Sequence, residues 1–198
     1  MRAIALCIAW LALLAARPAW GEEIEVREAE LRAVEEGLVL DADFAFGLTP
    51  RLSEIVASGV PLYFRVDFEL TRRRWYWFDE TAAAQRLHLR LSYHALSRQY
   101  RLSTGLLQQS FPTLDEALNV LKRIRSWLVV DRTVTFSDAD YEAAVRMRLD
   151  TTLLPKPFQL SALTSRELQL DSPWQRFTVR PRQLPAPVES REPAQVER

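Results

Sequence analysis

The sequence predicts a mainly β fold, an antiparallel β-sandwich-like domain with two short helices over residues 49–58 and 113–124. Three observations predict it. Apolar and polar side chains alternate along several segments, which is typical of strands with one buried and one wetted face and therefore of antiparallel sheets. Helix signals occur in two segments only, too few for a fold of alternating strands and helices. The 198 residues suffice for one such domain with short extensions.

The clearest alternation runs through residues 60–71. One face of this predicted strand is wholly apolar and carries Val60, Leu62, Phe64, Val66, Phe68 and Leu70. The other face is polar and carries Tyr63, Arg65, Asp67, Glu69 and Thr71. A strand of this kind packs its apolar face on a core and turns the other face to solvent.

Similar patterns predict further strands over residues 38–46, 86–94, 100–102, 134–136, 141–150 and 175–179. The short link 95–98 makes a hairpin of the two segments that flank it. A weaker strand is predicted over 23–34. Its apolar parity shifts between Val26 and Ala29, as a β-bulge would produce.

Both helices have recognisable ends. In the first, Thr49 is the expected N-cap, Pro50 takes the first helical position and Gly59 ends the helix. In the second, Thr113 and Glu116 have the spacing of a capping box, and apolar residues follow at helical spacing as far as Ile124. We expect each helix to cover one end or face of a sheet.

The two ends of the chain have different compositions from its middle. Arg2 followed by the apolar run 3–16 predicts a secretory signal over residues 1–21, cleaved after Gly21 or nearer Ala19; an uncleaved anchor or a buried helix is the alternative. Cys7, the only cysteine, lies in that run, so the mature chain would have no disulfide. The proline-rich segment 181–198 has few large apolar residues and is predicted to be disordered. A single β-rich domain over residues 22–180 remains.

Composition argues against several kinds of function. Lys+Arg and Asp+Glu are both 26, so no overall charge attracts nucleic acid. Gly is only 5 residues, and no glycine-rich phosphate loop or G-x-S-x-G motif occurs. His88 and His94 lie about 20 Å apart on an extended strand, too far to share a metal ion. We therefore predict no cofactor, no metal site and no nucleic-acid partner.

Two pairs of carboxylates share the outer faces of predicted strands, Asp41 with Asp43 and Asp67 with Glu69. A glycosidase-type hydrolase could use such a separation. Cross-strand salt bridges with Arg65 and with arginines of neighbouring strands are the alternative, and we favour it.

The best candidate for a binding surface follows the strand over residues 60–71. It consists of Arg72, Arg73, Arg74, Trp75, Tyr76, Trp77 and Phe78. Tryptophan and tyrosine are common at protein interfaces and at membrane headgroup level, and arginine beside them suits carboxylate or phosphate groups. The alternative is a strand buried on both faces whose arginines extend outward to water.

Several motifs resemble an uncharacterised family of exported bacterial proteins, domain of unknown function 4390, also labelled proline-rich signal-peptide protein. They are GVPLYF at 59–64, RWYWFD at 74–79, LSY at 91–93, LSRQY at 96–100, LD at 149–150 and LLPKPFQ at 153–159. The resemblance covers about residues 30–180. His94 departs from it, because many members have asparagine there.

The resemblance implies a Gram-negative, cell-envelope protein and supplies no activity, cofactor or catalytic residue. Members are often encoded beside a membrane sensor kinase of the nitrogen-regulation type. We therefore expect an exported, periplasmic, non-enzymatic binding or accessory module for a membrane-bound envelope partner, such as a sensor kinase. The alternative is a protein that binds lipid at the membrane surface through residues 72–78. A carboxylate-based hydrolase is the least favoured expectation.

Overall fold

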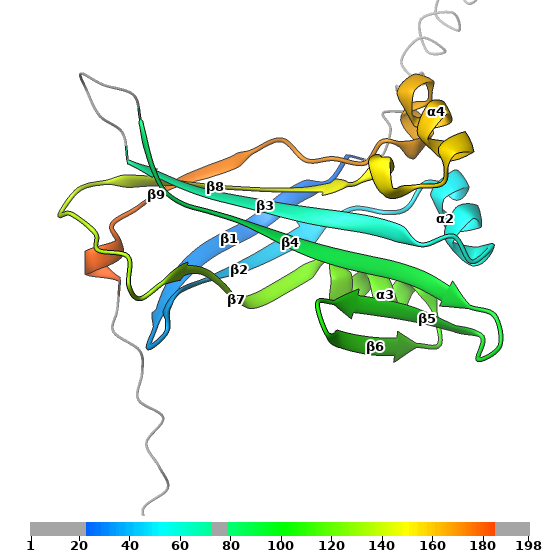
Figure 1. The fold of residues 1–198 in the computed structure, drawn as a ribbon, viewed down its shortest axis with the longest axis horizontal. Coiled ribbons are helices and arrows are strands. Elements are labelled where there is room, and N and C mark those ends of the chain that lie inside the picture. Colours follow the sequence, from blue (N-terminus) through cyan, green and yellow to red (C-terminus); the bar gives the residue numbers. More distant parts are fainter. Residues whose placement is uncertain (1–22, 73–78, 185–198) are drawn as a thin grey trace, which may run out of the picture.

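The computed structural model describes residues 23–72 and 79–184, which form two antiparallel β-sheets (Figure 1). One sheet has three strands in the order β1-β2-β7, and the other has six in the order β6-β5-β4-β3-β8-β9. The strands are β1 (Glu25–Val34), β2 (Gly37–Ala45), β3 (Leu62–Arg72), β4 (Glu80–His94), β5 (Gln99–Thr104), β6 (Leu107–Phe111), β7 (Arg123–Asp131), β8 (Tyr141–Leu149) and β9 (Gln175–Val179). The predicted fold class is confirmed.

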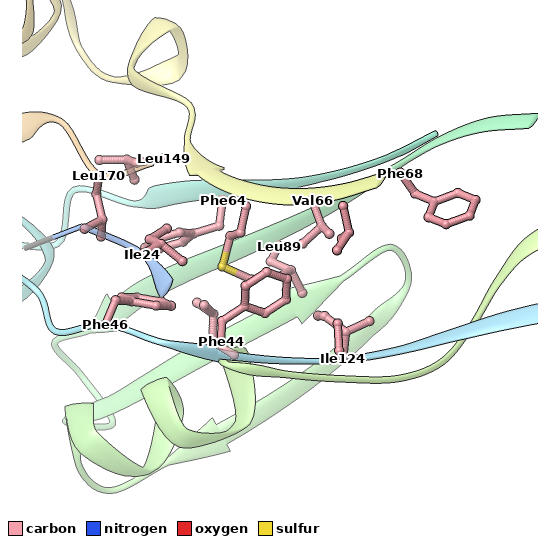
Figure 2. Packing of buried hydrophobic residues seen from close by; sticks show 14 of the residues in the cluster. Ile24, Phe44, Phe46, Phe64, Val66, Phe68, Leu89, Ile124, Leu149 and Leu170 are labelled. Atoms are coloured by element: carbon pink, nitrogen blue, oxygen red, sulfur yellow. The ribbon is translucent and has the colours of Figure 1, made fainter. Parts of the chain in front are cut away.

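The core lies between the two sheets and is formed by the apolar faces that the alternating sequence pattern predicted to be buried. The apolar face of β3 is buried from Leu62 to Leu70, and β2 faces it with Leu40, Ala42 and Phe44. Figure 2 shows Phe44 and Phe64 projecting into the same space from opposite sheets. Burial of this apolar surface is the main favourable contribution to folding.

Two local predictions along the strands are confirmed. The register of β1 against β2 shifts between Val26 and Glu28, which is the expected bulge. Strands β4 and β5 form the expected hairpin, in which His94 pairs with Gln99. Arg98 in its turn has a φ of 52°, and the His94 ring lies 3.0 Å from the Ser97 hydroxyl.

Helix α2 (Pro50–Ala57) begins and ends as predicted. The Thr49 hydroxyl accepts a hydrogen bond from the Leu52 amide at 3.2 Å and donates one to the Glu167 carbonyl at 2.7 Å. Gly59 follows the helix with a φ of 91°. The cap therefore also ties α2 to the chain beyond β8.

Helix α3 (Leu114–Leu121) has the predicted capping pair, with the Glu116 amide donating to the Thr113 hydroxyl at 3.3 Å. Its predicted end was wrong. The helix ends at Leu121 and the chain is a β-strand from Arg123, whereas the helix was predicted to continue to residue 124. Ile124 fits a helical stripe, but it also fits a strand, and pairing of Ile124 with Ala42 on β2 decides for the strand. Strand β7 begins where the helix was expected to continue.

Other differences arise where periodicity is weak. Residues 134–136 are a loop, in which the Val134 amide bonds to the Asp131 carbonyl at 3.1 Å, so the predicted strand there was wrong. Strands β6 and β7 were not predicted, nor was the third described helix, α4 (Lys156–Thr164). Helix α4 buries only Ala162, so it has no apolar stripe to reveal it. Figure 1 shows α2 and α4 together at one end of the sheets.

Short 3-10 turns complete the described chain: η1 (Thr151–Leu153), η2 (Arg166–Leu168) and η3 (Pro181–Gln183). The predicted signal segment and residues 185–198 of the predicted tail lie outside the described residues. No helix in the described part of the chain is long and apolar enough to span a membrane.

Candidate anion-binding site

The structure describes only one residue of the predicted Arg/aromatic surface. Arg72 lies at the end of β3, with its guanidinium 2.6 Å from the Glu80 carboxylate and 2.8 Å from the Ser137 hydroxyl. Arg72 is thus part of an ion pair between β3 and β4. Residues 73–78 lie outside the described residues, so a binding role for them stays a prediction.

A different polar group occupies the outer face of the six-stranded sheet. We call it the arginine cluster: Asp67 together with Arg65, Arg86, Arg146 and Arg148. Asp67 on β3 pairs in register with Arg86 on β4 and with Arg146 on β8. Arg65, two residues before Asp67, pairs with Arg148. Since alternate residues of a strand share a face, three neighbouring strands bring all five side chains together.

Both oxygens of the Asp67 carboxylate have arginine neighbours. Oδ1 lies 3.1 Å from Arg65 Nε and 3.6 Å from Arg86 Nε. Oδ2 lies 3.1 Å from Arg146 Nε, which donates a hydrogen bond to it, and 3.4 Å from Arg148 Nε. The Asp67 side chain is only 7% exposed. A charge this buried is stable only with close partners of opposite sign.

The cluster has more positive than negative charge. Four guanidinium groups surround one carboxylate, so four minus one leaves a surplus of three positive charges. Arg65 Nε is buried and makes no hydrogen bond in the described structure, although it lies 3.1 Å from Asp67. Its N–H does not point at the carboxylate, so we treat this contact as an ion pair that leaves a donor available.

The cluster lines a hollow of about 440 Å³ together with Glu69 and Gln85. This volume falls within the range of small-molecule sites, roughly 300–1,000 Å³. Glu69 is exposed and lies at its edge, which lowers the local surplus. The hollow is open, so its arginines can meet a group on a larger partner as well as a free ion.

Regular structure holds the cluster in place. Strands β3, β4 and β8 are interior strands of their sheet, paired on both sides. The Arg146 guanidinium carbon lies 4.3 Å from the Trp174 ring centre, a cation–π contact that restrains this arginine. Buried Ser172 positions the segment that carries Trp174, because its hydroxyl accepts from the Met147 amide at 3.0 Å.

The carboxylate pairs proposed from the sequence are bound by arginine. Asp41 accepts from Arg32 Nε at 2.6 Å, and Asp43 accepts from Arg125 at 2.6 and 2.9 Å. The favoured alternative of cross-strand salt bridges is confirmed at Asp41, Asp43 and Asp67. No group of three or more His, Cys, Asp or Glu side chains suited to a metal gathers within residues 23–72 and 79–184.

Sequence reasoning identified part of this site. It placed Arg65 and Asp67 on one outer face and expected arginines of neighbouring strands beside them. It did not identify a four-arginine site, because that requires β8 to lie next to β3. The sequence feature that could have indicated the site is the position of Arg86, Arg146 and Arg148, which all fall on the polar faces of their predicted strands.

A family model described as "Domain of unknown function (DUF4390)" matches residues 21–178, most of the chain. The chain belongs to this family. The match spans β1 to nearly the end of β9 and includes every residue of the arginine cluster. No curated protein and no solved structure matches the chain. The resemblance noted in the sequence is therefore confirmed.

Proposed function

We propose that this DUF4390 protein is an exported, non-enzymatic binding module whose arginine cluster binds a phosphate-type oxyanion. One observation carries the proposal: four guanidinium groups lie within 3.6 Å of a single buried carboxylate. An anion with more than one negative charge would neutralise the surplus that Asp67 leaves.

The chemistry of arginine favours this ligand. A guanidinium group is planar, keeps its charge and presents several donors in a fork that fits phosphate or carboxylate oxygens. If the cluster served only to pair Asp67, one or two arginines would balance its charge. The arginines beyond that number repel one another, which lowers the stability of the fold unless a bound anion offsets their charge.

The ion pairs also support a binding role over a hydrolytic one. A hydrolase needs one carboxyl group free to transfer a proton and a second that attacks or activates water. Asp41, Asp43 and Asp67 are each engaged by arginine, so three of the four candidate carboxylates already have fixed partners.

We propose a partner in the cell envelope, in line with the predicted signal segment and the family resemblance. A membrane-bound protein, such as a sensor kinase, and a lipid headgroup can both present the phosphate-type group. These two sources share one chemistry at the arginine cluster. The Arg/aromatic segment 72–78 would then be a second contact with the same partner.

Calorimetric titration with inorganic phosphate and pyrophosphate, at constant ionic strength in chloride, tests the proposal. We expect pyrophosphate to bind more tightly than phosphate, and the double variant Arg146→Gln/Arg148→Gln to lose at least about tenfold in affinity for both. Arg125→Gln is the matched control, because Arg125 pairs with Asp43 in the other sheet. Equal affinity in the wild type, the double variant and the control would refute the proposal.

Vesicle co-sedimentation distinguishes the two sources. Phosphatidylglycerol vesicles that bind the wild type but not the double variant would identify a lipid headgroup. Phosphatidylcholine vesicles control for the phosphate of a neutral lipid. Binding of pyrophosphate without binding of either vesicle would point to a phosphate-bearing group on a partner that is not lipid.

A further inference from the structure

The space between the sheets is not closed on every side. An apolar pocket of about 330 Å³ opens where the hairpin of β5 and β6 extends from the six-stranded sheet. The residues that line it belong to β4, β5, β6, α3 and β7, whose places in the fold can be followed in Figure 1. The apolar lining includes Leu87, Leu89, Leu102, Leu107, Ile124 and Trp127.

The pocket exists because the two sheets differ in width. The six-stranded sheet has β5 and β6 beyond β4, whereas the facing sheet ends at β7. Leu89 and Ile124, both buried, project into the space between the sheets (Figure 2) and also line the pocket. Toward solvent, Val120 is 39% exposed and Leu107 is 73% exposed. Apolar surface thus continues from the buried core to the outside.

Positive charge borders this apolar pocket. Arg123 lines it and also lines a neighbouring polar hollow of about 1050 Å³. That hollow has four basic side chains, Arg27, Lys122, Arg123 and Arg125, against two acidic ones, Glu28 and Asp43, so its surplus is two positive charges. Arg125 is engaged by Asp43, whereas no carboxylate of the described chain forms an ion pair with Arg123.

We propose that this pocket binds a fatty-acid-type amphiphile, with its alkyl chain among the leucines and its carboxylate at Arg123. The apolar lining favours the chain, and Arg123, which is exposed and forms no ion pair within residues 23–72 and 79–184, favours an anionic head. The volume lies at the lower end of the range for ligand sites, which suits a single medium-length chain better than a two-chain lipid. This inference does not depend on the arginine cluster, which lies on the opposite face of the sheet.

The proposal predicts how affinity changes with the ligand. Each added methylene should tighten binding by about fourfold from hexanoate to decanoate, since each buries more apolar surface. Decanol, which has the same chain without the charge, should bind at least about tenfold more weakly than decanoate. Decyltrimethylammonium should bind weakest, because its cationic head would lie beside Arg123.

Three variants distinguish binding in the pocket from non-specific binding. Val120→Trp fills the mouth from an exposed helix position, and Arg123→Gln removes the rim charge. Leu106→Gln is the matched control, because Leu106 is fully exposed and does not line the pocket. All three residues are exposed, and exposed positions tolerate substitution. Circular dichroism should therefore show the same fold in each variant as in the wild type.

Titration of decanoate by calorimetry, below the concentration at which it forms micelles, tests the proposal. We expect Val120→Trp to lower the affinity at least tenfold and Arg123→Gln to lower it about tenfold, while Leu106→Gln matches the wild type. Absence of decanoate binding to the wild type would overturn the proposal. Equal binding of decanol and decanoate, or unchanged binding by Val120→Trp, would also overturn it.

Discussion

Asp67 on β3 and Arg146 on β8 form a hydrogen-bonded ion pair of 3.1 Å on the outer face of the six-stranded sheet. Arg146 is held from a second direction by Trp174, whose ring centre lies 4.3 Å from the guanidinium carbon. The ion pair thus links β3 to β8, and the contact with Trp174 links both to the segment before β9. Three further arginines share the same carboxylate, and this excess of positive charge is the basis of the proposed function.

Removing the ring that holds Arg146 should weaken both the fold and the site. We expect Trp174→Ala to lower the free energy of unfolding by about 1 kcal/mol, the usual size of a partly exposed cation–π contact with its apolar burial. Affinity for pyrophosphate should fall, because Arg146 would no longer be held in one orientation. Urea denaturation and calorimetry measure the two effects. Trp174→Phe, which keeps an aromatic face, should recover part of each, and a failure of Phe to recover either would contradict this account.

The core between the sheets should depend strongly on Phe64. Its side chain is fully buried, and its ring centre lies 5.7 Å from that of Phe46. Phe64→Ala should therefore lower the free energy of unfolding by about 3–5 kcal/mol, through lost burial and the cavity left behind. Leu163→Ala on α4 is the control, since Leu163 is 79% exposed and should change stability by less than about 0.5 kcal/mol. Similar losses from both substitutions, in urea denaturation, would show that the assigned core is wrong.

The sequence predicted the fold where the two faces of a strand differ clearly, as in residues 60–71. It failed at the end of α3, because Ile124 satisfies both helical and strand spacing and only the pairing with Ala42 selects the strand. Helix α4 buries one residue, so its sequence has no stripe to detect. The arginine cluster depends on strand order, which alternation does not encode. For that reason Arg86 and Arg146, far apart in sequence, could not be placed on either side of Asp67.

The hairpin between β1 and β2 should require glycine at position 37. Gly37 has a φ of 144°, and a Cβ atom there would lie 2.0 Å from the Val130 carbonyl oxygen on β7. Gly37→Ala should therefore lower the free energy of unfolding by about 3 kcal/mol, since backbone strain and a steric clash add together. Gly105→Ala is the matched control, with a φ of 58° and no atom within 4 Å of the added Cβ. It should cost about 1 kcal/mol from strain alone. Equal thermal shifts in the two variants would mean that β2 and β7 do not approach as closely as described.

The Asp140–Arg180 ion pair predicts a pH dependence at the end of the sheet. The hydrogen bond from Arg180 lowers the pKa of the Asp140 carboxyl below its ordinary value of 3.8, mainly by favouring the charged form. Because this pKa is lower in the folded protein, the pair stabilises the fold at pH values above the ordinary pKa. That stabilisation is lost as the pH falls through the lowered pKa. Wild type should therefore have a slightly higher Tm than Asp140→Asn at about pH 7, and the difference should shrink as the pH is lowered below 3.8. A difference that persists in acid would show that Asp140 acts through something other than its charge.

The most direct test of the anion-binding account is the affinity of Asp67→Asn for pyrophosphate, measured by calorimetry beside the wild type. The substitution removes the carboxylate that the four arginines share, so the surplus of the arginine cluster rises from three positive charges to four. We expect the variant to be about 3 kcal/mol less stable, because the arginines then repel one another without a counter-charge. We also expect it to bind pyrophosphate about tenfold more tightly than the wild type and to regain stability in its presence. A folded Asp67→Asn variant with unchanged or weaker affinity would contradict the account, since the arginines would then serve only to pair Asp67.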